Sequence, residues 1–147
     1  GDAAPPHREA DWTAPSGWKE LPASGMRAGA YSVPSNGGPI EITVVPLTGG
    51  AGGDLANVNR WRGQLGLTPI DEAGLAKVTT RASVGPHEAV VVEFASSGAD
   101  AKRLLAATLI QGNVSWFFKA VGPDAATTRL KPDFLTFVGS VRFHTHD

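Results

Sequence analysis

Apolar residues recur at every second position along much of the chain, which is the pattern of half-buried β-strands. The segments with this period cover residues 25–33, 40–47, 76–84, 87–96, 101–111 and 114–122. Pro46 cannot donate a backbone hydrogen bond, so its strand is expected to fray there or to lie at a sheet edge. Segment 101–111 has a composition that also suits a helix, but the "QGN" that follows is typical of a hairpin turn, and we predict a strand.

Residues 54–65, "DLANVNRWRGQL", change to the 3.6-residue period of an amphipathic helix. Its apolar stripe contains Leu55, Val58, Trp61 or Arg62, and Leu65. A second stripe carries Asn57, Arg60 and Gln64, which are not needed for burial. Asp54 follows a glycine run and is predicted as the N-cap, with Gly66 as the C-terminal stop. The "TPIDEAGL" that follows is expected to be a connector with one helical turn at most.

Helical spacing returns near the C-terminus, at Leu130, Phe134, Phe137 or Val138, and Val141. Pro132 is acceptable in a first helical turn, so this helix is expected to begin close to it and to be followed by a short strand. The order is then a strand pair, a helix, four strands and a helix. It predicts an α+β fold in which an antiparallel β-sheet is sandwiched by α-helices.

The length of 147 residues suits a single domain with one core. Residues 1–11 are rich in Ala and Pro and are predicted to form an extended tether, residues 12–143 the α+β domain, and residues 144–147 a C-terminal tail. Because the chain begins with Gly1 rather than Met, we expect that an N-terminal segment has been removed, either an export signal or one that carried a lipid anchor. A cytosolic protein with a disordered front end is the alternative.

Composition excludes several classes of function. A net charge of −1 provides no excess of Lys and Arg for nucleic acid or for an anionic membrane surface. The chain has no cysteine, which rules out disulfides, thiolate metal sites and cysteine nucleophiles. Its longest apolar runs, "AVVVEFA" and "LLAATLI", are far shorter than the ~20 residues that span a bilayer.

The glycine run at residues 49–53 precedes a helix, as in phosphate-binding loops. A P-loop requires a Lys followed by Ser or Thr after its last glycine, and Asp54 and Leu55 stand there instead. We therefore interpret the run as a flexible loop.

Three histidines are candidates for metal binding or for catalysis. His144 and His146 lie two residues apart and could share a metal, but a third ligand is missing. His87 and Glu88 could act as a base and its orienting partner, but no turn motif marks a nucleophile. We predict no catalytic residues, no metal site and no cofactor, and therefore a protein that is not an enzyme.

The aromatic run at residues 116–118 is assigned to the core on at least one face of the sheet. The helix at 54–65 is the remaining candidate, because aromatic and arginine residues are enriched at interface hot spots. We assign partner or ligand binding to Asn57, Arg60, Trp61 and Gln64. The same residues could instead form a structural clamp that ties the helix to neighbouring loops.

Several phrases resemble the PsbP-like family, whose founding members are extrinsic subunits of the photosynthetic oxygen-evolving complex. They are "APSGW" at the start of the domain, "SWFFKAVG" in a late strand and "FLTFVGSVRF" at the end. The resemblance covers roughly residues 12 to 143 as a pattern, and it is closest to uncharacterised exported bacterial proteins that share "NVNRWRGQ". None of the matched phrases carries a manganese-binding role.

The resemblance implies a non-catalytic accessory or scaffold domain of the bacterial cell envelope that binds a protein partner. A carrier of a small polar or anionic ligand, held between the 54–65 helix and the sheet, is the alternative. The protein is expected to be a monomer, exported to the periplasm or anchored on the envelope side of a membrane. The identity of the partner or ligand is left open by the sequence.

Overall fold

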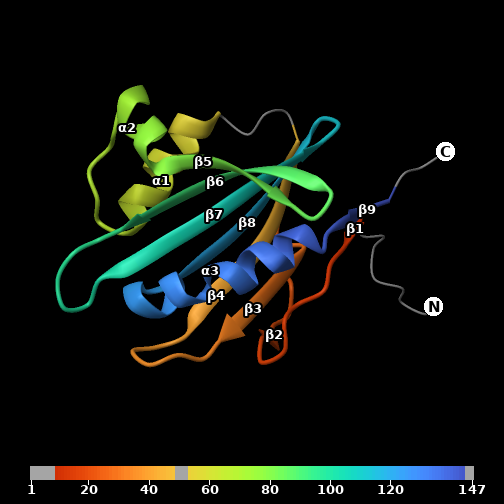
Figure 1. Ribbon diagram of the computed structural model, residues 1–147, viewed down its shortest axis with the longest axis horizontal. Coiled ribbons are helices and arrows are strands. Elements are labelled where there is room, and N and C mark those ends of the chain that lie inside the picture. The colour runs from red at the N-terminus through yellow and green to blue at the C-terminus, as the bar shows by residue number, and fades with distance from the viewer. Residues whose placement is uncertain (1–8, 49–52, 145–147) are drawn as a thin grey trace.

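The computed structural model describes residues 9–48 and 53–144, and a seven-stranded antiparallel sheet lies at the centre of this part of the chain (Figure 1). Its strands are β2 (Lys19–Glu20), β3 (Gly29–Val33), β4 (Ile40–Thr48), β5 (Thr79–Val84), β6 (His87–Ala95), β7 (Lys102–Gln111) and β8 (Val114–Pro123). They are arranged in the order β2-β3-β4-β8-β7-β6-β5. The pairing of β4 with β8 joins two groups of consecutive strands, so the middle of the sheet depends on a long-range contact.

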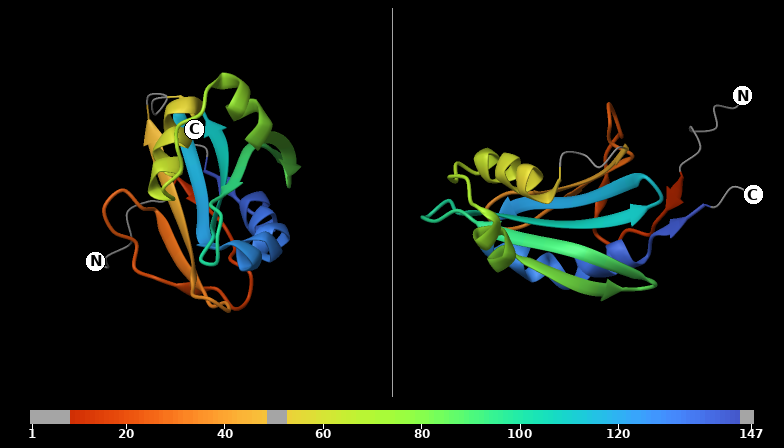
Figure 2. Two further views of the ribbon diagram at one scale, coloured as in Figure 1. Left: turned by 90° about the vertical axis from the view of Figure 1, so that its left-hand side faces the viewer. Right: turned by 90° about the horizontal axis from the view of Figure 1, so that it is seen from above.

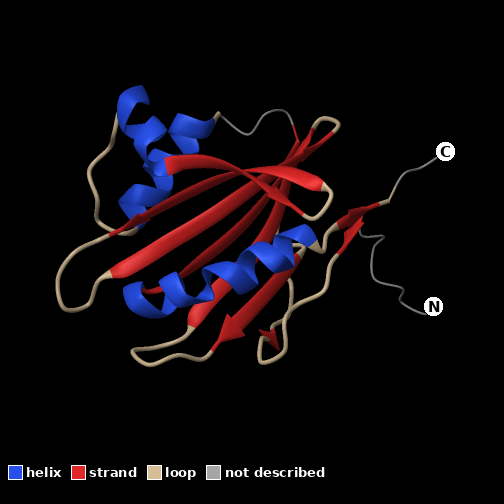
Figure 3. Ribbon diagram, viewed as in Figure 1, coloured by secondary structure: helices blue, strands red, loops and turns tan. Residues whose placement is uncertain are grey.

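Helices cover both faces of this sheet. Helix α1 (Asp54–Gln64) and the short α2 (Glu72–Val78) lie on one side, and α3 (Asp124–Gly139) crosses the other (Figures 2 and 3). The predicted α+β fold, an antiparallel sheet between α-helices, is therefore confirmed. Segment 101–111, for which strand and helix were both considered, forms strand β7 from Lys102 to Gln111.

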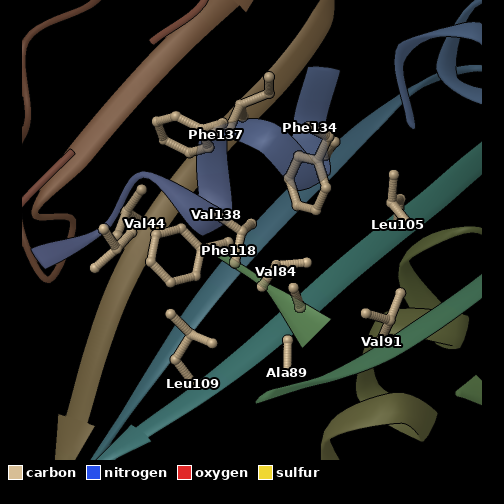
Figure 4. Close-up of a cluster of buried hydrophobic side chains, with 14 of the residues drawn as sticks. Val44, Val84, Ala89, Val91, Leu105, Leu109, Phe118, Phe134, Phe137 and Val138 are labelled. Atoms are coloured by element: carbon tan, nitrogen blue, oxygen red, sulfur yellow. The ribbon is translucent and has the colours of Figure 1, made fainter. Parts of the chain in front are cut away.

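The alternation of side chains along β8 supplies a core on each face of the sheet. Trp116 and Phe118 belong to the larger cluster under α3, and both are almost fully buried. Figure 4 shows Phe118 within this cluster, near Phe137 and Val138 of α3. Phe117 points the other way and packs with Val58 and Trp61 of α1. The aromatic run is thus part of the core on both faces of the sheet, and the sequence analysis predicted this for at least one face.

The edge expected at Pro46 is present. On one side of β4, the pairing with β3 ends where Val44 meets Gly29. On the other side, pairing with β8 continues through Pro46 and Trp116 to Thr48. Pro46 therefore lies where β4 has a neighbour on one side only, as a residue without an amide hydrogen requires.

The connector between α1 and the next strand contains a longer helix than the single turn that the sequence analysis allowed. Residues 72–78 form helix α2, and the strand that was expected to begin at residue 76 begins at Thr79. The side chain of Asp71 caps the helix by accepting a hydrogen bond of 2.9 Å from the backbone amide of Gly74. An N-cap aspartate of this kind satisfies an otherwise unpaired amide and favours a short helix over an extended chain.

Helix α3 also begins earlier than predicted, at Asp124, and this places Pro132 inside the helix rather than in its first turn. Proline in a helix interior costs roughly 3 kcal/mol, because it removes one backbone hydrogen bond and crowds the preceding turn. Pro132 is exposed, whereas Leu130 and Phe134 beside it are buried against the sheet. Packing on that buried face keeps the helix continuous.

The predicted boundaries of the tether and the tail need correction. Strand β1 (Ala10–Asp11) pairs with β9 (Arg142–Phe143), and Ala10 is completely buried. The His144 ring contacts the Asp11 carboxylate, with Nε2 at 2.7 Å from Oδ2. The fold therefore includes residues 9–11 and His144, while the rest of the predicted tether and residues 145–147 lie outside the described residues.

A close approach between backbones fixes α3 against the hairpin of β5 and β6. Gly85 in that hairpin has φ of 57°, and a Cβ placed on it would lie 2.3 Å from the carbonyl oxygen of Gly139. Gly112, in the hairpin of β7 and β8, has a similar φ of 61° but open space around it. The two glycines thus share a backbone conformation and differ in what surrounds them.

We expect Gly85→Ala to destabilise the protein by about 3–5 kcal/mol, because left-handed strain adds to overpacking against a backbone that cannot yield cheaply. Gly112→Ala carries only the left-handed strain and should cost about 1–2 kcal/mol. Urea unfolding of both variants measures the difference. Equal losses would show that the contact between the hairpin and α3 is not a constraint on the fold.

Candidate functional site

Helix α1 starts differently from its prediction. Gly53 occupies the N-cap position with φ of 86°, and Asp54 is the first helical residue, so Asp54 is not the cap. No side chain caps this end. Asp54 is still stabilising there, because a carboxylate in the first turn interacts favourably with the helix dipole. Of the glycine run, residues 49–52 lie outside the described part of the chain.

The buried face of α1 consists of Asn57, Val58 and Trp61. The expectation that Asn57 belongs to an exposed stripe is therefore wrong: its side chain is 3% exposed. The physical reason is the direction of the buried stripe. Asn57 and Trp61 are four residues apart and lie on one face of the helix, and the large indole ring brings that face down onto the sheet.

The structural clamp considered for this helix exists, but two other residues form it. The side-chain amide of Asn59 donates to the carbonyl of Ile70 at 3.0 Å and accepts from its backbone N–H at 2.8 Å. Arg62 Nε donates to the carbonyl of Thr68 at 2.8 Å. These bonds hold the connector against α1, and they leave Arg60 and Gln64 without a clamping role.

Arg60, Trp61 and Gln64 line one pocket, between α1 and the neighbouring strands β4 and β8. Its volume is about 140 Å³. The sheet contributes the remaining lining residues, Thr43, Val45, Leu47, Phe117 and Lys119. Three of the four residues assigned from sequence thus lie together, and Asn57 lies apart in a smaller hollow of about 40 Å³ on the other side of Trp61.

The position of the pocket follows from how far α1 extends over the sheet. Helix α1 packs on residues of β6, β7 and β8, including Val92, Leu104 and Phe117. On the same face, β4 presents Thr43 and Val45, which remain half-buried. The pocket opens where the cover of α1 ends and β4 continues.

Two cations approach the Trp61 ring in this pocket. Lys119 Nζ lies 5.7 Å from the centroid of the indole, and the Arg60 guanidinium carbon lies 6.0 Å from it. Lys119 also donates a hydrogen bond of 3.3 Å to Gln64 Oε1. Both cations are within the range of cation–π attraction, which contributes little at exposed sites and more where water is excluded.

The environment of Lys119 disfavours its charge. Desolvation by burial lowers the pKa of Lys119 below its usual value of 10.5, and the charges of Arg60 and Arg27 lower it further. The Glu41 carboxylate acts in the opposite direction but more weakly. Among the described residues, no carboxylate lies within 4 Å of Lys119 or Arg60. The pocket therefore carries positive charge that no ion pair with a described residue neutralises, although Glu41 offsets it in part.

Two larger hollows among the described residues do not bring two unpaired cations together. One, about 560 Å³, is an open depression between the β3–β4 hairpin and α3, where Arg129 and Asp133 offset each other in charge. A second open depression, lined by residues of β5 and α3, contains no charged side chain.

The histidines considered for chemistry are occupied in structural contacts. His87 Nε2 lies 2.7 Å from the carbonyl oxygen of Val141, and its ring stacks edge-on against Phe143. His144 contacts Asp11, and His146 lies outside the described residues. Within residues 9–48 and 53–144, no three metal-binding side chains gather at one point.

No family model and no curated protein matches the sequence. Solved structures do match, among them LpqN of Mycobacterium tuberculosis, with 18% identity, a TM-score of 0.61, and coverage of 92% of this chain and 83% of LpqN. Cyanobacterial PsbP from Synechocystis matches at 12% identity with a TM-score of 0.58, over 92% of this chain and 87% of that protein. The chain has the PsbP-like fold.

A third protein with this PsbP-like arrangement, from Bacteroides thetaiotaomicron, has 9% identity and a TM-score of 0.60. This chain spans 46% of its length. LpqN is described as involved in cell envelope biogenesis of its organism. At these identities the comparisons establish the fold.

Sequence reasoning missed the strand residues of the site. Lys119 directly follows the aromatic run, and Thr43, Val45 and Leu47 lie in the predicted strand 40–47, but no motif marks any of the four as a site residue. The signal that was present is the period of two, which places Lys119 on the same face as Phe117. The pairing of Thr43 with Lys119 and of Val45 with Phe117, which joins β4 to β8, carries no local signature.

We expect Arg60→Ala to change the free energy of unfolding by less than ~0.5 kcal/mol, because Arg60 is exposed and makes no clamping bond. Asn59→Ala should cost about 1–3 kcal/mol, because it removes two hydrogen bonds to Ile70. Thermal and urea unfolding of the two variants test this contrast. A larger loss for Arg60→Ala than for Asn59→Ala would reassign Arg60 to the clamp.

We expect Lys119→Met to be at least as stable as the wild type at pH 7. The lowered pKa means that the unfolded chain binds the Lys119 proton more tightly than the folded chain, so folding is opposed while the lysine is charged. The free energy of unfolding of the wild type should therefore rise relative to that of the variant as the pH increases toward 10.5. Urea unfolding at pH 7 and at pH 10 measures this difference.

The exposed Lys102 on β7 provides a matched control, since Lys102→Met also removes one strand lysine. It should change stability by less than ~0.5 kcal/mol at neutral pH. A clear loss of stability in Lys119→Met at pH 7, absent from Lys102→Met, would mean that Lys119 stabilises the fold.

Proposed function

We propose that this protein is a non-catalytic accessory domain of the bacterial cell envelope that binds a protein partner through the exposed side of α1. Arg60 and Gln64, together with the adjoining strand β4, form the docking surface. The observation that supports this proposal is that the residues of α1 have three separate roles. Asn57, Val58 and Trp61 pack, Asn59 and Arg62 clamp, and Arg60 and Gln64 are exposed beside an open pocket.

The composition of this surface supports recognition of a partner. Arginine is enriched at hot spots of protein interfaces, and Arg60 is exposed beside the pocket, whereas Trp61 is buried and forms part of its wall. The pocket also provides amide, hydroxyl and cationic side chains that can hydrogen-bond to a partner, with Lys119 bonded to Gln64.

Export to the periplasmic or envelope side is part of the proposal. It is supported by the likeness in fold to LpqN, described as involved in cell envelope biogenesis. The longest described helix, α3, has 16 residues and does not reach the length needed to span a bilayer. A lipid anchor upstream of Gly1, and a monomeric state in solution, complete the proposal.

A second candidate function is that of a small-ligand carrier, and the pocket supports it. The volume of about 140 Å³ is below the range of about 300 Å³ and more that is usual for drug-sized ligands. Any ligand held there is therefore small, or is one end of a larger molecule. Docking remains the first candidate because the pocket continues into an exposed helix surface.

The docking proposal is tested with a photoreactive phenylalanine analogue in place of Gln64, expressed in the source bacterium. We expect one discrete crosslinked protein, and its loss when Arg60→Ala is added. The same analogue in place of Arg129, an exposed helix residue on the opposite face, is the control. Crosslinks from position 129 alone would place the docking surface over α3 instead.

A further inference from the structure

The pocket between α1 and β4 has an apolar floor and a positively charged rim. Its floor is formed by Val45, Leu47, Trp61 and Phe117, and its rim by Arg60 and Lys119. We propose that it binds a carboxylate attached to a small apolar group of about six carbon atoms, with the carboxylate between Lys119 and Arg60. This inference rests on the proposed function, because it names the chemistry that the same surface recognises.

The volume sets the size of the apolar group. A cavity of ~150 Å³ lined by aliphatic and aromatic side chains is known to accept benzene. The pocket, at about 140 Å³, is close to that size, and four of its eight lining residues are aliphatic or aromatic. It therefore fits a leucine-sized or phenyl-sized group, either as a small molecule or as the end of a larger one.

The two cations of the pocket favour a negatively charged ligand. Lys119 and Arg60 each lie about 6 Å from the centroid of one indole ring, and no described carboxylate pairs with either. Hydrogen bonds between cations and a carboxylate are about twice as strong as neutral ones. A carboxylate in the pocket would gain such bonds and would reduce the repulsion between the two cations.

Stability alone does not account for Lys119 in this position. It is half-buried on β8, between Phe117 and Val121 on the same face of the strand. Burial and the neighbouring guanidinium groups lower its pKa, so its charged form opposes folding. A group that weakens the fold where an apolar residue would strengthen it is typical of binding sites.

Two sources supply the same chemistry: a free short-chain acid, or the carboxyl terminus of a polypeptide that ends in an apolar residue. Carboxyl termini are commonly recognised by concave sites of this kind. The docking surface of α1 adjoins the pocket, so a polypeptide terminus could bind there while the rest of the partner covers Arg60 and Gln64.

The probes are N-acetyl-leucine, hexanoate, N-acetyl-leucinamide and inorganic phosphate, followed by the indole N–H resonance of Trp61 in proton–nitrogen correlation spectra. Trp61→Phe identifies that resonance among those of the four tryptophans. We expect N-acetyl-leucine and hexanoate to shift it in a saturable way. The neutral amide and the phosphate should have little effect, because each lacks one half of the proposed ligand.

Variants locate the site. Lys119→Met should weaken binding of N-acetyl-leucine ~10- to 100-fold, because it removes a charge-assisted hydrogen bond in a half-buried position. Arg60→Ala should weaken it ~2- to 5-fold, because Arg60 is exposed and screened by water. Lys102→Met should bind as the wild type does, and the unaltered remainder of each spectrum shows that the variant is folded.

Equal binding of the acid and its amide would overturn the role of the charges, and equal binding of phosphate would overturn the role of the apolar floor. If no probe shifts Trp61 but the crosslink from position 64 persists, this inference fails and the docking proposal stands. If the acids bind but position 64 yields no crosslink, the docking proposal fails and the pocket stands. A peptide that ends in leucine, compared with its amidated form and with hexanoate, identifies the source.

Discussion

The fold depends on the requirement that both faces of strand β8 be covered. Trp116, Phe117 and Phe118 are consecutive, so their large side chains alternate between two faces, and all three are buried. A sheet without helices would expose all three to water, and a sheet covered on one face would still expose one or two, at a cost of about 1.5–3 kcal/mol for each ring. Helix α3 covers one face, and α1 with α2 covers the other (Figure 2). The sandwich of helices follows from this one strand.

The helices on the two faces of the sheet differ in length, and the pocket lies where the shorter helix, α1, leaves part of the sheet uncovered. Helix α3 has 16 residues and lies across the sheet, whereas α1 has 11 and packs over β6, β7 and part of β8. Along β8 the side chains on the α1 face change from Phe117, which is buried beneath Trp61, to Lys119, which is half-buried at the limit of the helix. A lysine is tolerated there because its amine lies over the indole of Trp61 and donates a hydrogen bond to Gln64.

Much of this could be predicted from local patterns, and the remainder depends on long-range contacts. Alternation located the long strands, and the helical period placed Arg60 and Gln64 away from the packed face. It misplaced Asn57, because Asn57 lies four residues before Trp61, and the packing of Trp61 on the sheet buries both residues. The length of α2 was underestimated because seven residues with an internal glycine have little helical preference, and the cap from Asp71 decides their conformation.

Lys119 shows why a site of this kind resists sequence analysis. In the sequence it is one cation next to an aromatic run, and nothing local distinguishes it from a solvated strand residue. Its significance comes from three separate elements: β4 beside it, α1 above it, and Arg27 in the segment before β3. Each is positioned by the packing of β8 rather than by any motif. The same constraint that makes the fold predictable therefore also assembles a charged pocket from residues whose local sequences do not indicate it.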